Sequence, residues 1–120
     1  MKEKKNEIML TQYGNNASIK IHIKNKTTMK DAGFRKTDNS WFYSRKLHGS
    51  VTFSVMIKSE TDWRIDVDDD DFDQPYDYQT YLANNPQHWY AKAIELYATA
   101  EMMFLKHYGI VTGWEEGDYL

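Results

Sequence analysis

Two neighbouring segments of this chain alternate apolar and polar residues with a period of two. The first, 51–58, and the second, 63–67, both place their apolar side chains at odd-numbered positions. This alternation is typical of β-strands that bury one face. A short polar turn at 59–61 separates the two segments, so we expect them to pair as antiparallel neighbours. A sheet with one apolar face needs a second layer to cover that face.

Three more segments are predicted strands of the same sheet, namely 7–13, 18–24 and 41–47. Turn-forming residues separate them: Gly14-Asn15-Asn16, Asp38-Asn39-Ser40 and His48-Gly49-Ser50. A short helix over Met29–Ala32 is predicted between the second and third strands. Thr27 or Thr28 would cap it and Gly33 would close it.

Residues 86–108 are predicted to form a long C-terminal helix that starts at Pro86 and ends before Gly109. A shorter helical turn is predicted over 78–84. The apolar residues of the long helix project as one broad stripe toward the sheet; they are Trp89, Tyr90, Ala93, Ile94, Leu96, Tyr97, Ala100, Met103, Phe104, Leu105 and Tyr108.

The predicted fold class is therefore α+β. An antiparallel sheet of about five strands, with a short helix between strands 2 and 3, is packed on one face by the long C-terminal helix. We expect a flexible N-terminus at 1–6, a single domain at 7–109 and an acidic-aromatic C-terminal tail at 110–120.

The composition excludes several classes of protein. The 120 residues include no cysteine, which rules out disulfides, thiolate metal sites and a cysteine nucleophile. No stretch approaches the ~20 apolar residues of a membrane span. The charged start of the chain lacks the apolar segment of a signal peptide. These features predict a cytoplasmic location.

Charge is distributed very unevenly along the chain. Residues 1–58 carry 12 basic and 4 acidic side chains, whereas 59–120 carry 3 basic and 14 acidic ones. The net charge of −3 thus conceals halves of +8 and −11. Such asymmetry is typical of a surface for nucleic acid or a partner protein. The alternative is that the two halves interleave in the fold and neutralise each other.

The most conspicuous segment is acidic and aromatic, and it follows the last predicted strand. We interpret it as a loop whose carboxylates and rings contact a partner protein. Carboxylates held in this way can occupy a basic groove that normally binds phosphates. The predicted partner-binding residues are Asp68, Asp69, Asp70, Asp71, Phe72, Asp73, Tyr76, Asp77 and Tyr78.

The same acids resemble a calcium-binding loop only in part. Asp66, Asp68 and Asp70 have the required spacing, and Asp77 falls at the twelfth position. Asp71, however, stands where the sharp turn needs glycine, and Asp77 replaces a bidentate glutamate. We therefore expect no dedicated metal site and no cofactor.

A second hypothesis uses the basic half of the chain as a nucleic-acid surface. Trp41 and Tyr43 could stack on bases beside these cations. Lysine on the outer face of a strand is equally typical of edge protection. The basic candidates are Lys20, His22, Lys24, Lys26, Lys30, Arg35, Lys36, Arg45 and Lys46.

Support for catalysis is thin. His22, His48, His88 and His107 have neither metalloprotease spacing nor a serine partner, and no glycine-rich phosphate loop is present. Glu101 falls inside the predicted apolar stripe, so we expect it to be paired with a side chain of the sheet rather than to act as an acid. A metal-dependent enzyme built around Asp66–Asp77 is a third, weaker hypothesis.

In composition the chain is similar to small phage and mobile-element proteins that inhibit host nucleases, although it matches no family motif. The resemblance implies a non-enzymatic inhibitor that engages a nucleic-acid-handling protein through an acidic-aromatic surface. Direct nucleic-acid binding by the basic half is the alternative.

Overall fold

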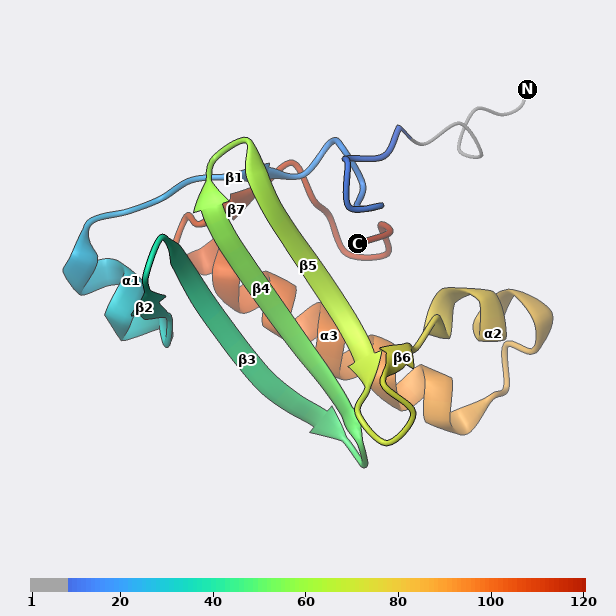
Figure 1. Cartoon of the computed structure of the whole chain (residues 1–120). Coiled ribbons are helices and arrows are strands. Elements are labelled where there is room, and N and C mark those ends of the chain that lie inside the picture. Colours follow the sequence, from blue (N-terminus) through green and yellow to red (C-terminus); the bar gives the residue numbers. More distant parts are fainter. Residues whose placement is uncertain (1–8) are drawn as a thin grey trace, which may run out of the picture.

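The computed structural model describes residues 9–120, and its centre is a five-stranded antiparallel sheet (Figure 1). The strands lie in the order β2-β3-β4-β5-β6. This confirms an α+β fold with a five-stranded sheet and a C-terminal helix. The strands are β2 Arg35–Thr37, β3 Ser40–His48, β4 Val51–Ser59, β5 Asp62–Asp69 and β6 Gln74–Pro75.

The sheet has one buried face and one open face. In the middle of the sheet, Val55 of β4 lies opposite Tyr43 of β3 and Ile65 of β5, and all three side chains are buried. The residues between them point the other way and are partly or fully exposed. The alternation in the sequence therefore predicted the core face of β4 and β5 correctly.

The long helix α3, Trp89–His107, crosses the buried face and lies behind the sheet in Figure 1. It starts three residues later than predicted, because His88 caps it: the Nδ1 atom of His88 accepts a bond from the amide of Ala91 at 3.2 Å. Pro86 lies in the turn before the helix. No helix within residues 9–120 has the length and apolar character to cross a membrane.

The predicted apolar stripe of α3 is largely wrong. The helix buries a narrower set of residues, two of them small, namely Ala91, Ile94, Ala98, Met102 and Leu105. Most of the large side chains of the predicted stripe are exposed on the opposite side. The helix is apolar on two faces, so periodicity alone could not show which face meets the sheet.

The predicted first strand is also wrong. Residues 11–14 form a turn, and Leu10 makes only an isolated bridge to Asn16; residues 7 and 8 lie outside the described part of the chain. The buried side chain of Asn15 takes the place of a strand: its amide group exchanges two hydrogen bonds, of 2.8 and 3.0 Å, with the backbone of Ile65 on β5.

The strand predicted at 18–24 is reduced to β1, Lys20–Ile21, which pairs with β7, Val111–Thr112, in a separate small sheet. This pairing ties the start of the described chain to its end. The segment 110–120, expected as a tail, contributes Ile110, Val111 and Trp114 to the core.

The short helix α1, Lys26–Ala32, does not lie between the second and third strands as predicted. It precedes β2, and the other two helices follow β5. The order differs because the first predicted strand does not form and β2 adds an unpredicted edge strand. Asn25, rather than Thr27 or Thr28, caps the helix, and Gly33 closes it at φ 106°.

Candidate protein-contact surface at the acidic end of the sheet

The acidic segment is a tight hairpin rather than the loop predicted at 68–77. β5 continues to Asp69, and β6 returns beside it, so that Asp68 pairs with Pro75 and Asp69 with Gln74. The turn between them needs a left-handed residue, which is Asp73 at φ 50°. The hairpin gives the carboxylates fixed positions.

Hydroxyl groups from the neighbouring strand hold two of the acids in place. The Ser50 hydroxyl donates to Asp69 at 2.7 Å, and the Thr52 hydroxyl donates to Asp70 at 2.5 Å. The backbone amide of Asp71 also donates to Asp69, at 3.1 Å. Asp69 therefore organises the turn, whereas Asp71 and Asp73 are exposed.

Three carboxylates form a row along the open face of the sheet. Asp66 and Asp68 face Ser54 and Thr52 across the β4–β5 ladder, and Asp70 bonds to the same Thr52. Residues two apart on a strand are about 6.6 Å apart. Burial and the neighbouring carboxylates, chiefly Asp66, raise the pKa of Asp68.

The aromatic members of the predicted site separate into exposed and buried rings. Phe72 is 71% exposed at the hairpin tip. Tyr76 is half-buried, and burial raises the pKa of its hydroxyl. Tyr78 is only 6% exposed and packs against Ile94 and Ala98, so its ring cannot contact a partner. Burial raises its pKa as well.

A further exposed ring, Tyr81, completes this surface. The sequence already placed it among the tyrosines interleaved with the acids, although the predicted site residues did not include it. It lies on α2, Tyr78–Asn84, with its ring centroid 5.2 Å from that of Tyr76. Asp77 caps α2, accepting bonds from the amide and the hydroxyl of Thr80 at 3.1 and 2.7 Å.

We call the resulting set the acidic–aromatic surface. It consists of Asp66, Asp68, Asp69, Asp70, Asp71, Phe72, Asp73, Tyr76, Asp77 and Tyr81.

The acids are engaged with protein groups rather than converging on one point. Asp66 pairs with Arg64 at 2.8 Å, Asp70 with Thr52, and Asp77 with α2. Within residues 9–120, no group of three or more histidine and carboxylate side chains is arranged to hold a metal ion. The arrangement can attract cations over a wide area, but it does not build a chelating centre.

Several basic residues of the first half lie at the other edge of the sheet, whereas Lys46 of β3 lies in register with Thr52 and Asp68. β2, which carries Arg35 and Lys36, and α1, which carries Lys26 and Lys30, lie at the opposite edge from β6 and α2 (Figure 1). In the described part of the chain, the ion pairs are Arg64–Asp66 and Lys106–Glu115, and both lie within the acidic half. Within residues 9–120, the two halves therefore do not neutralise each other by direct pairing.

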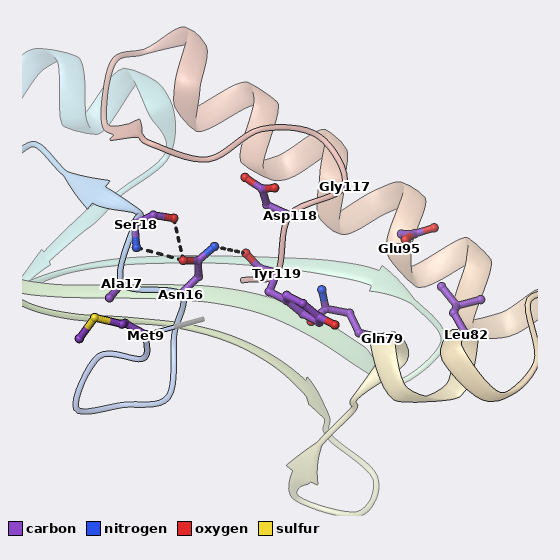
Figure 2. A pocket seen from close by; sticks show the side chains of 10 residues that line it. All are labelled: Met9, Asn16, Ala17, Ser18, Gln79, Leu82, Glu95, Gly117, Asp118 and Tyr119. Carbon is purple, nitrogen blue, oxygen red and sulfur yellow. Dashed lines mark hydrogen bonds between the residues drawn. The ribbon is translucent and has the colours of Figure 1, made fainter. Parts of the chain in front are cut away.

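A separate groove of about 900 Å³ lies between α2, α3 and the two ends of the described chain (Figure 2). Its polar groups largely bond to one another: Ser18 donates its hydroxyl to Asn16 at 2.7 Å, and Asn16 donates to the Tyr119 carbonyl at 3.3 Å. None of the predicted site residues lines it.

Comparison with protein-family models, curated proteins and solved structures finds no significant match to this chain.

Proposed function

We propose that this chain is a non-enzymatic interaction module whose acidic–aromatic surface binds the basic, phosphate-binding groove of another protein. The observation that carries the proposal is the row of Asp66, Asp68 and Asp70. Asp66 and Asp68, two residues apart on β5, are about 6.6 Å apart along the strand, which is comparable with the distance between successive phosphates in a nucleic-acid strand. Asp70 continues the row from the first position of the turn. A groove that binds a row of phosphates could therefore bind this row of carboxylates.

The fixed positions of two carboxylates support binding to a basic groove. Thr52 and Ser50 already fix Asp70 and Asp69, so little side-chain entropy is lost when a partner binds. Repulsion among the acids is relieved when basic side chains approach. Burial raises the pKa of Asp68 most, and the neighbouring charge of Asp66 raises it further. A cationic partner would lower that pKa again.

The exposed rings supply contact area that charges alone do not. Phe72 extends beyond the hairpin, and Tyr76 and Tyr81 form a half-buried platform beside it. Aromatic side chains at the centre of an interface contribute mainly to residence time, whereas surrounding charges contribute mainly to association rate. Inhibition of a nuclease or another nucleic-acid-handling protein is the most concrete form of this function.

Nucleic-acid binding by the basic half is the second candidate, and cations beside aromatic rings favour it. Lys36 lies 4.9 Å from the ring of Trp41, and Arg45 lies 4.5 Å from that of Tyr43. Both rings are buried, however, so they cannot stack on bases. This candidate therefore ranks below the first.

The test is capture of partners from a cell lysate treated with nuclease, with the chain immobilised. The variant Asp68→Asn/Asp70→Asn/Asp71→Asn removes three charges, leaves Asp69 in place and keeps an acceptor for Thr52. We expect it to lose any partner that the original chain captures, most clearly at low salt. The control Lys20→Gln/Lys24→Gln, which removes two charges from the basic half, should capture that partner normally.

The captured protein should then lose its affinity for nucleic acid when the original chain is added. Phe72→Ala should speed dissociation of the complex, at a cost of about 1–2 kcal/mol, whereas Tyr119→Ala, at an exposed ring outside the surface, should not. If the lysine variant loses the partner and the aspartate variant keeps it, the proposal is wrong, and the basic half of the chain is the binding surface.

A further inference from the structure

The helix α3 presents an apolar face to solvent directly opposite the face that it buries. Trp89 is 70% exposed and Leu96 is 66% exposed, and Met103, Tyr97 and Phe104 are also exposed. Large apolar side chains gathered on one helix face are uncommon on a monomer and mark an interaction site. Tyr97 and Phe104 lie at the edge of this face, where they stack on His48 and Tyr43 of β3 at centroid distances of 6.3 and 6.5 Å, and the rest of their surface is open to solvent.

The spacing of this outer face is that of a helix-pairing seam. Its central positions follow intervals of four and three residues and alternate large with small side chains; they are Trp89, Ala93, Leu96, Ala100, Met103 and His107. Apolar residues at these intervals keep a seam on one side of a helix. The alanines, seven residues apart, leave gaps that a partner's large side chains can fill.

We propose that the outer face of α3 pairs with the same face of a second copy of this chain. The two helices run antiparallel about a two-fold axis at the level of Ala98. This register places Leu96 opposite Ala100 of the second copy, Ala93 opposite its Met103, and Trp89 opposite its His107. Each contact matches a large residue with a smaller one, as a self-complementary interface requires.

A groove beside Ala93 fits this pairing. It has a volume of about 690 Å³, and its walls are α3, including Trp89 and Leu96, and the C-terminal segment at Glu116 and Gly117. In the proposed register, Met103 of the second copy enters this groove. Methionine is well suited to such a gap because its side chain is flexible.

The available area suits a weak dimer. Buried aromatic residues contribute about 150–250 Å² each, so the partly exposed side chains of this face offer on the order of 500 Å² per copy. Stable interfaces bury roughly 600–800 Å² per partner. Two copies would bury about 1,000 Å² in total, at the lower limit for a specific interface, so we expect weak association in the micromolar range.

This surface is independent of the proposed function. The row of Asp66, Asp68 and Asp70 lies on the open face of the sheet, whereas α3 covers the other face. A dimer through α3 therefore leaves both acidic rows free. Failure of partner capture would not affect the dimer, and failure of the dimer would not affect capture by one copy.

The first test is sedimentation equilibrium from micromolar to millimolar concentration. The original chain should show a reversible monomer–dimer equilibrium, and Ala100→Glu should weaken it at least tenfold, because the charge would face Leu96 of the second copy. Ala83→Glu is the matched control, since Ala83 is an exposed alanine on helix α2. Circular dichroism should show that both variants keep the fold. A monomer at all concentrations overturns the proposal.

The second test examines the register by disulfide cross-linking. The chain has no cysteine of its own, so only the introduced cysteines can form a disulfide. Ala93→Cys and Met103→Cys chains should form a disulfide when mixed and oxidised, because these positions face each other. Neither variant should cross-link with itself, since identical positions lie about 15 Å apart along the helices. Cross-linking of Ala93→Cys alone overturns the antiparallel register.

Discussion

At the scale of single residues, Glu101 is the clearest case of a partly buried carboxylate explained by its partner. The Tyr43 hydroxyl of β3 donates a hydrogen bond to the Glu101 carboxylate of α3, which confirms the prediction that Glu101 is paired with the sheet. Burial, and then this carboxylate, raise the pKa of Tyr43. The pair joins the helix to the sheet.

Replacing the tyrosine should alter both stability and its dependence on pH. Tyr43→Phe should lower the free energy of unfolding by about 1–2 kcal/mol at neutral pH. In the original chain the protonated hydroxyl stabilises the fold fully below the unfolded pKa of about 10. That contribution is lost as pH rises through the higher folded pKa. Urea unfolding from about pH 7 to about pH 11 should therefore show a shallower alkaline decline in the variant.

Glu101→Gln serves as the companion variant, because it keeps an acceptor but removes the charge. We expect it to cost about 1 kcal/mol and to leave partner capture unchanged. Equal stability of Glu101→Gln and the original chain would show that the carboxylate contributes nothing to the fold.

The sequence indicated some residues of the candidate site and not others. Asp71 and Phe72 were predictable because a dense run of acids around an apolar residue belongs at the surface. Tyr78 was not, because its burial depends on α2 folding back onto α3. Asp66 was considered only as a calcium ligand, and its place in the row appears once β5 is paired with β4.

At the scale of elements, the junction of β1 with β7 carries a sharp steric requirement. Gly113 has φ 78°, and a Cβ atom there would lie 2.1 Å from the carbonyl oxygen of Ser18. Gly113→Ala should therefore force the two chain segments apart. We expect a loss of about 2–4 kcal/mol, measured by urea unfolding.

Gly117, in the same C-terminal segment, is the control position. Gly117 has φ 96°, but nothing lies within 4 Å of a Cβ atom at that position. Gly117→Ala should cost only the backbone strain, about 1 kcal/mol. Similar losses for the two variants would contradict the close approach at Ser18.

The success of element prediction followed the strength of the periodic signal. β4 and β5 were predicted because their apolar residues alternate over eight and five residues, and β3 because turn-forming residues bound it on both sides. β2 and β6 have three and two residues, which is too short for any period to appear. The predicted number of five strands was right, but β2 and β6 belong to the sheet in place of the predicted strands at 7–13 and 18–24.

At the scale of the whole molecule, the cations of α1 and β2 lie at the opposite edge of the sheet from the acids of β5 and its turn. The acids of β5 and of the turn to β6 are close to one another, whereas α1 and β2 place their cations far from them. Repulsion within the acidic edge should therefore outweigh attraction between the edges. Added salt raises stability where repulsion within the acidic edge dominates, and lowers it where attraction between the edges dominates.

We expect the free energy of unfolding in urea to rise, by less than about 1 kcal/mol, as sodium chloride increases from about 0.01 M to about 0.1 M. The screening length falls over this range from about 30 Å to about 10 Å, which weakens repulsion among neighbouring carboxylates. Asp68→Asn should raise stability at low salt and reduce the salt effect, because Asp68 has a raised pKa beside Asp66, Asp70 and Asp73. A fall in stability with salt would instead mean that attraction between the basic and acidic edges dominates the fold.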